Sequence, residues 1–278
     1  MAIMSKVFLD YDQQALDAAY DQAAYAPNRD QVLARFAHAS ELARMRLGIP
    51  ERLSYGERPI EGLDLYRTRK PDAPVVVYVH GGAWRAGLAR DYAFPAEMLT
   101  RAGAHYAVLD FDNALETGGD LVPMAEQVQR GIAWASKNIS SSLYVCGSSS
   151  GAHLAGVAAT TALPVKGYVL ASGMYDLRGP RLSKRSSYVK FTDAVEEALS
   201  PQRHLERVKA PITLVYGSLD TPEFQRQSRD FADALTRAGK SAEIIRAEGY
   251  NHFELTETLG NPYGPLGRAL LAQMKIGA

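Results

Sequence analysis

The sequence predicts an α/β fold with a mostly parallel central sheet and helices on both faces. Two observations predict this class. Short apolar strands alternate with helical segments along most of the 278 residues, and residues 75–79 are apolar and mostly β-branched, as in a strand buried on both faces. The expected strands are 63–67, 75–79, 106–111, 143–147, 168–172, 212–216 and 242–246. The expected helices are 92–102, 121–138, 150–161, 224–238 and 264–275.

The N-terminal segment, residues 1–50, lies outside this alternation. Residues 9–25 and 30–47 have the apolar spacing of two amphipathic helices, and Pro27 separates them. The second helix is expected to end at Gly48, because glycine is common just after a helix. The segment therefore predicts a helical addition that precedes the sheet.

A second segment, residues 176–205, interrupts the strand and helix order. It is polar and basic at first and then carries a short helical stretch. We interpret it as an insertion over one end of the sheet and not as a separate domain. The sequence thus predicts a single domain, residues 1–278, in which residues 1–50 and 176–205 form a small helical cap over the active site.

The composition restricts the class of partner. Hydrophobic residues make up 46% of the chain, and 31 Lys and Arg balance 31 Asp and Glu. A balanced charge gives no electrostatic reason to expect nucleic acid or a membrane surface as partner. The one cysteine, Cys146, cannot form an intrachain disulfide, which fits a reducing compartment. With no signal-like or membrane-spanning apolar run, we expect a cytoplasmic protein that acts on a small molecule, and a homodimer is left open.

Three serines between two glycines form the first candidate site. The stretch GSSSG, residues 147–151, matches the pattern G-x-S-x-G only with Ser149 at its centre. An apolar strand precedes it and the helical run 152–158 follows it, which is the strand–turn–helix setting of a strained catalytic serine. The alternative is an ordinary serine-rich turn that caps the helix. The sequence predicts Ser149 as the nucleophile.

A serine hydroxyl needs a base and an acid that orients the base. Asp220 follows the apolar strand 212–216, and His252 follows the last strand, 242–246. In folds where a catalytic serine occupies such a strand–turn–helix, the acid and then the histidine follow it along the chain, which is the order Ser, Asp, His found here. We therefore predict Ser149, Asp220 and His252 as a catalytic triad, with His252 in the loop after the last strand.

Each member of this triad has an alternative. Glu223 is a rival acid, and Asp220 could instead be an N-cap of the helix that begins near Glu223. His252 could be an ordinary surface histidine. His153 falls inside a predicted helix, and we expect it to pack or to form a hydrogen bond rather than to act as a base.

The stretch HGGAW supplies the remaining part of the site. It follows the strand 75–79, and its two glycines allow backbone N–H groups to turn toward a reacting oxygen. We predict an oxyanion hole from the N–H groups of Gly82 and Ser150, with that of Gly81 or Ala83 as a further candidate donor. His80 is expected to brace this loop. We expect no metal and no cofactor, since no clustered His, Cys and Asp pattern occurs in the sequence.

With these residues, the chain resembles the α/β-hydrolase superfamily and, within it, the arylformamidase (kynurenine formamidase) group, which neighbours the carboxylesterases of the hormone-sensitive-lipase type. The resemblance covers nearly the whole chain. The matching stretches are HGGAW (80–84), GSSSGAHL (147–154), SGMYDL (172–177), SPQRHL (200–205), PEFQRQS (222–228) and NHF (251–253). The family usually has HGGYW and GHSAG, so Ala83 and Ser148 are departures that change the size and polarity of the pocket.

The resemblance implies hydrolysis of a small N-formyl or N-acyl amide through an acyl-enzyme. A carboxylesterase acting on short-chain acyl esters is the first alternative, and a non-catalytic ligand-binding protein on the same fold is the second. Trp84 and Tyr175 are candidates for substrate contact, although ordinary packing explains them equally well.

Overall fold

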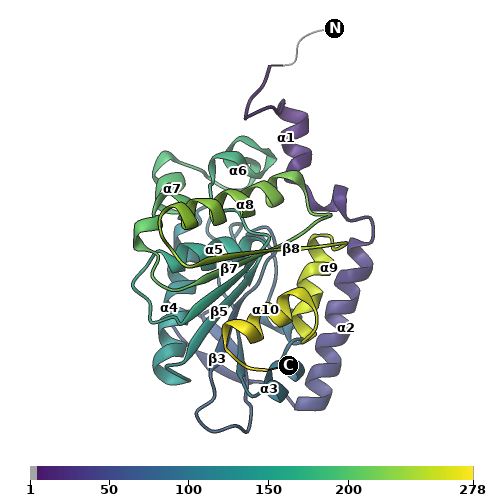
Figure 1. Cartoon of the computed structure of the whole chain (residues 1–278), viewed down its shortest axis with the longest axis vertical. Helices are drawn as coiled ribbons and strands as arrows, with labels where there is room; N and C mark the ends of the chain where they lie inside the picture. The colour runs from purple at the N-terminus through teal and green to yellow at the C-terminus, as the bar shows by residue number, and fades with distance from the viewer. Residues whose placement is uncertain (1–4, 278) are drawn as a thin grey trace.

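The computed structural model describes residues 5–277, and these residues form one eight-stranded sheet with helices on both faces (Figure 1). The strands are β1 (Glu51–Ser54), β2 (Gly62–Tyr66), β3 (Val75–Val79), β4 (His105–Leu109), β5 (Leu143–Ser148), β6 (Gly167–Ala171), β7 (Ile212–Gly217) and β8 (Ala242–Ala247). They lie in the order β1-β2-β4-β3-β5-β6-β7-β8. β2 is antiparallel to both of its neighbours, and every other pair is parallel. The predicted fold class is confirmed.

The helices connect the strands and cover both sides of the sheet. The α-helices are α1 (Gln13–Ala19), α2 (Arg29–Leu47), α3 (Ala96–Ala102), α4 (Val122–Asn138), α5 (Ser150–Ala159), α6 (Arg178–Leu182), α7 (Asp193–Ala198), α8 (Pro222–Arg237), α9 (His252–Glu257) and α10 (Pro265–Gln273). The 3₁₀ helices are η1 (Gln22–Tyr25), η2 (Ala89–Tyr92), η3 (Lys184–Ser187), η4 (Pro201–Arg203), η5 (Leu205–Arg207) and η6 (Thr258–Gly260).

Strand β3 shows how the sheet divides the core into two layers. All five of its residues are buried, and alternate side chains point to opposite faces. Val75, Val77 and Val79 pack with apolar residues of α4, α5 and α8, whereas Val76 and Tyr78 pack with those of α3 and α10. Figure 1 shows α4 and α5 on one side of the sheet and α10 and α2 on the other. Because both faces are covered, nearly all positions of the central strands are apolar.

The structure differs from the sequence prediction in three elements. The strand β1 was not predicted, because its residues are polar and mostly exposed and it pairs only at the sheet edge. The single helix expected over 9–25 is α1 followed by η1, since the Asp21 side chain caps η1 and starts a new turn. His252 is the first residue of α9 rather than a loop residue, because Asn251 caps that helix.

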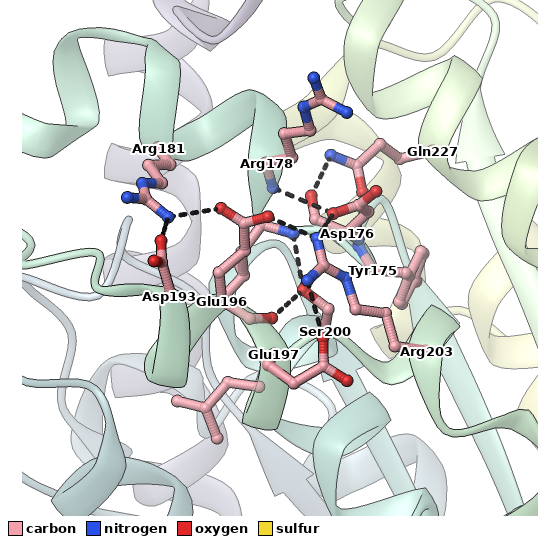
Figure 2. A network of polar contacts seen from close by, with 12 residues as sticks. Tyr175, Asp176, Arg178, Arg181, Asp193, Glu196, Glu197, Ser200, Arg203 and Gln227 are labelled. Carbon is pink, nitrogen blue, oxygen red and sulfur yellow. Dashed lines mark hydrogen bonds and ion pairs between the residues drawn. The ribbon is translucent and has the colours of Figure 1, made fainter.

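The N-terminal segment and the 176–205 insertion meet each other. The Gln13 amide donates to the Leu182 carbonyl at 2.9 Å, and the Lys184 backbone N–H donates to Asp17 at 2.6 Å. Figure 1 shows α1 beside α6 at one end of the molecule, while α2 runs along the side next to α9. Within the insertion, Figure 2 shows a network of charged side chains centred on Glu196.

Candidate active site

Ser149 lies at a strained turn between β5 and α5. Its φ and ψ are 56° and −124°, a conformation that costs a non-glycine residue roughly 1–3 kcal/mol. The turn requires its two glycines. A Cβ on Gly147 would lie 2.6 Å from the Gly151 carbonyl oxygen, and a Cβ on Gly151 would lie 2.1 Å from that of Val79. The G-x-S-x-G spacing is therefore explained by close backbone packing that holds Ser149 at the carboxyl end of β5.

Asp220 and His252 meet after β7 and β8. The His252 Nδ1 lies 2.9 Å from Asp220 Oδ1, and both side chains are buried. A carboxylate can only accept, so Nδ1 carries the proton and Nε2 keeps a lone pair. No hydrogen bond joins the Ser149 hydroxyl to His252 among residues 5–277, and such bonds commonly tighten only in the Michaelis complex. The pair is thus arranged as a histidine base held by an acid.

Glu223, the rival acid, is engaged elsewhere. Arg226 donates to both of its oxygens at 2.7 Å, and the Tyr20 hydroxyl donates to one of them at 2.8 Å. Asp220 is not the N-cap of α8, because the Thr221 side chain accepts from the Phe224 N–H. The geometry favours Asp220 as the partner of His252.

The HGGAW loop passes directly beside Ser149. A Cβ on Gly81 would lie 3.0 Å from the Ser149 Cβ, and a Cβ on Gly82, with φ at 127°, would lie 1.9 Å from the Ala86 carbonyl oxygen. Ala83 and Trp84 also have positive φ, so three consecutive residues are in conformations that only glycine adopts readily. Strain of this kind concentrates at functional sites.

Two backbone N–H groups of this region are free to bind an oxygen. No described residue accepts a hydrogen bond from the Gly82 N–H. Ser150 begins α5, so its N–H has no partner within the helix. The role of Gly81, Gly82 and Ser150 as an oxyanion hole remains a prediction, and the loop geometry is compatible with it.

One cavity of about 450 Å³ lies beside the HGGAW loop, Ser149 and His252. Gly81, Gly82, Ser149 and His252 all line it. Residues 21–37 of the N-terminal segment contribute much of the remaining wall. No residue of 176–205 is among its described lining residues. The insertion instead contacts two residues that do line it, since Lys184 donates to Asp21 and Arg185 donates to Gln22. A larger hollow of about 560 Å³, between α3 and α10, contains none of the candidate site residues.

The structure corrects two predicted substrate contacts. Trp84 is 2% exposed and its indole N–H donates to His153 Nδ1 at 3.1 Å. Tyr175 is fully buried and stacks on Phe231 with ring centroids 4.5 Å apart. Neither side chain lines the cavity. Both are packing residues. Trp84, with a φ of 61°, packs edge-on against His153, and Tyr175 packs on Phe231.

The other histidines near the site have structural contacts. His80 stacks between Tyr92 and Phe111, and its Nδ1 lies 2.9 Å from the Gly81 carbonyl oxygen, as expected of a residue that braces the loop. Burial lowers the pKa of His80. His153 Nε2 lies 2.8 Å from the Leu199 carbonyl oxygen, and burial lowers its pKa to about 4. Both rings are therefore neutral near pH 7.

Two residues at the site had not been predicted. Tyr78 Oη lies 2.6 Å from Ser148 Oγ, so the serine that departs from the family motif is held by a buried tyrosine. Gln22 lines the cavity from η1. The alternation along residues 75–79 predicts that Tyr78 lies on one face of the sheet, but it does not predict the hydrogen bond to Ser148. No sequence signal marks Gln22.

Two further findings concern other classes of site. Within residues 5–277, no three His, Cys, Asp or Glu side chains are grouped as metal ligands. No helix in the same range has the length and apolar character needed to cross a bilayer. The expectations of no cofactor and of a cytoplasmic location remain predictions.

Comparison with known proteins agrees with this fold and identifies the family. A family model described as BD-FAE matches residues 63–169. A kynurenine formamidase from Danio rerio is 33% identical over 221 residues, covering 74% of this chain and 75% of its own length. A kynurenine formamidase from Salmo salar is 32% identical over 257 residues, covering 85% of this chain and 84% of its own. A solved Silicibacter protein, provisionally assigned as a thioesterase, shares the fold with a TM-score of 0.81 and 24% identity, covering 91% of this chain and 97% of that chain. The chain belongs to the arylformamidase/esterase-like family of α/β-hydrolases.

Proposed function

We propose that this protein cleaves a small N-formyl or N-acyl amide through an acyl-enzyme formed on Ser149. One observation carries the proposal: the strained Ser149 and His252, whose Nδ1 is held by Asp220, line the same cavity. The two relatives named kynurenine formamidases support a formamide as the scissile group.

The first half of the reaction forms the acyl-enzyme. Ser149 Oγ attacks the carbonyl carbon while His252 Nε2 accepts the hydroxyl proton. Asp220 holds the tautomer and stabilises the imidazolium that forms. The carbonyl oxygen becomes an oxyanion that accepts hydrogen bonds from the N–H groups of Gly82 and Ser150. These donors lie on rigid backbone, so they need little rearrangement as the charge develops.

The second half of the reaction releases both products. His252 returns its proton to the amide nitrogen, because an amine leaves only after it is protonated. Water then attacks the acyl carbon, with His252 again as base, and the acid is released with Ser149 restored. Every step uses groups that line or adjoin the same cavity.

Replacement of Ser149 tests this proposal. We expect Ser149→Ala to lower kcat/KM for formanilide by about 10⁴-fold or more, with an unchanged circular dichroism spectrum. Ser148→Ala is the matched control, because the Ser148 hydroxyl is held by Tyr78, and it should lose far less. If Ser148→Ala removes activity and Ser149→Ala does not, the assigned nucleophile is wrong.

A carboxylesterase acting on short-chain acyl esters is the second candidate. Ala83 lines the cavity where the family motif has tyrosine, which leaves room for an acyl chain longer than formyl. The ratio of kcat/KM for formanilide to that for p-nitrophenyl acetate and butyrate discriminates the two. A ratio that favours the butyrate ester would support the esterase.

A ligand-binding protein on this fold would not use Ser149 as a nucleophile. A serine-directed fluorophosphonate should label the wild-type protein and not Ser149→Ala, because the reagent requires an activated hydroxyl. A wild-type protein that stays unlabelled while binding small amides would favour the binding function.

A further inference from the structure

Asn28 occupies the N-cap position of α2, but its side chain does not cap that helix. An asparagine at this position usually accepts a hydrogen bond from a backbone N–H of the first turn. The Asn28 carbonyl accepts from the Val32 N–H at 3.0 Å, as at any helix start, while the side chain makes no capping bond to α2. The side-chain amide instead meets Asn251 and Glu254, 223 and 226 residues later in the chain. Asn28 is therefore committed to a contact with another helix.

This contact joins the two residues that cap α9. Asn251 Oδ1 accepts from the backbone N–H groups of Phe253 and Glu254 at 3.0 and 3.1 Å. Glu254 Oε2 in turn accepts from the Asn251 N–H at 3.1 Å, which completes a capping box. Asn28 binds the other polar atom of each side chain. Its Oδ1 accepts from Asn251 Nδ2 at 2.8 Å, and its Nδ2 donates to Glu254 Oε1 at 2.7 Å.

Each member of this network has one consistent orientation. Asn251 turns its side-chain oxygen toward two backbone N–H groups, so its side-chain nitrogen faces Asn28. The Asn28 oxygen must then face Asn251, and the Asn28 nitrogen faces the Glu254 carboxylate, which only accepts. An asparagine suits this position because one short side chain carries both a donor and an acceptor. An aspartate of the same shape would place a second carboxylate against Glu254.

The capping box encloses the catalytic base. His252 is the first residue of α9 and lies between Asn251 and Glu254 in the chain. The bond from its Nδ1 to Asp220 at 2.9 Å fixes the tautomer of the ring, whereas the place of its Cα depends on the first turn of α9. This helix has six residues, and an isolated helix of that length is unstable in water. The position of His252 therefore depends on the groups that cap the helix.

A second contact between α2 and α9 lies at the other end of α9. Arg35 donates to both carboxylate oxygens of Glu257, the last residue of α9, at 2.6 and 2.8 Å. Both of these side chains are partly exposed. Neither Arg35 nor Asn28 is among the described residues that line the cavity of Ser149. The two contacts thus hold the same pair of helices, but only that of Asn28 involves the residues that flank His252.

We propose that Asn28 is a positioning residue for the catalytic base and acts through Asn251 and Glu254. The inference rests on the proposed hydrolase function and gives the N-terminal segment a part in catalysis beyond the cavity wall. Asn28 holds the capping box, the capping box holds the first turn of α9, and that turn sets where His252 Nε2 lies relative to Ser149. A displacement of about 1 Å in such a position can cost about 100-fold in rate.

Removal of the Asn28 amide tests the proposal against a matched control. We expect Asn28→Ala to lower kcat by about 10-fold and to leave KM within about twofold, because the residue acts on the base and not on the cavity wall. Arg35→Gln weakens the other contact between α2 and α9 and should leave kcat within about twofold. Both variants are assayed on the better substrate of formanilide and p-nitrophenyl acetate. An unchanged kcat in Asn28→Ala, a change confined to KM, or an equal loss of kcat in Arg35→Gln would overturn the proposal.

An exchange of amide and carboxylate provides a second test. Asn28→Asp places two carboxylates face to face, and Glu254→Gln places two amide NH₂ groups face to face, so each should lower kcat by about 10-fold. The double variant again sets a donor against an acceptor, and glutamine can still close a capping box. Its kcat should return to within about threefold of wild type, and a double variant no faster than the single variants would contradict the proposal. Failure of the hydrolase function would appear separately, as retained activity in Ser149→Ala.

Discussion

Residues 176–205 hold arginines in two different surroundings. In Figure 2, Arg181 and Arg203 both donate to Glu196, and each also reaches a second acid, Asp193 or Glu197. Arg185, in the same segment, is more deeply buried and meets only neutral acceptors. No member of the first group lines the cavity, whereas Arg185 donates a hydrogen bond to Gln22, which does. Within one segment, two partly exposed arginines are thus paired with acids, whereas the more deeply buried arginine is held by neutral groups.

The largest expected effect on stability comes from removing Glu196, the acid that Arg181 and Arg203 share. Glu196→Gln leaves Arg181 and Arg203 without their shared acid in a largely buried position. We expect the free energy of unfolding to fall by about 2 kcal/mol, since removing one partner of a buried ion pair is costly. The value for kcat/KM should stay within about twofold. Urea denaturation and steady-state kinetics on the same preparation measure both, and a stable variant with lost activity would place Glu196 in the catalytic machinery instead.

The same network predicts how stability depends on pH. Burial raises the pKa of Glu196, but the hydrogen bonds and charges of Arg203 and Arg181 outweigh it and hold the pKa below its ordinary value of 4.5. A carboxyl with a lowered pKa in the folded state stabilises the protein above its unfolded pKa, and this contribution is lost as pH falls through the folded value. The difference in unfolding free energy between wild type and Glu196→Gln should therefore be constant from pH 7 to about 5 and should narrow below about pH 4.5. A difference that stays constant down to pH 3 would contradict this account.

Much of the fold and of the candidate site was predictable because it depends on local pattern. The central strands are short apolar runs between turn residues, so their bounds agree with the structure to within one or two residues. Ser149, Asp220 and His252 each follow such a run, and parallel strands bring their carboxyl ends to one edge of the sheet. The helical start at His252 was also available, since Asn251 and Glu254 form a capping box.

The remaining features depend on contacts that sequence spacing does not reveal. Arg185 is buried because its guanidinium meets the Tyr20 carbonyl, 165 residues earlier in the chain. The edge strand β1 lacks an apolar face and forms through backbone pairing with β2. Trp84 was misassigned because its ring packs edge-on against His153, a contact that is invisible in the sequence. Such errors concentrate where tertiary contacts outweigh local preference.

The smallest expected effect on stability comes from removing the unpaired charge. Arg185→Met keeps most of the apolar volume among Tyr20, Trp84 and Phe224 but loses three hydrogen bonds to neutral acceptors. It also removes a charge that was desolvated without an acid, and replacing buried charges with apolar side chains is often neutral or stabilising. We expect these effects to cancel to within about 1 kcal/mol, measured by urea denaturation beside Glu196→Gln. A loss as large as that of Glu196→Gln would make Arg185 a structural residue like Arg203. A small change would show that this buried charge, held by neutral acceptors alone, contributes little to the stability of the fold.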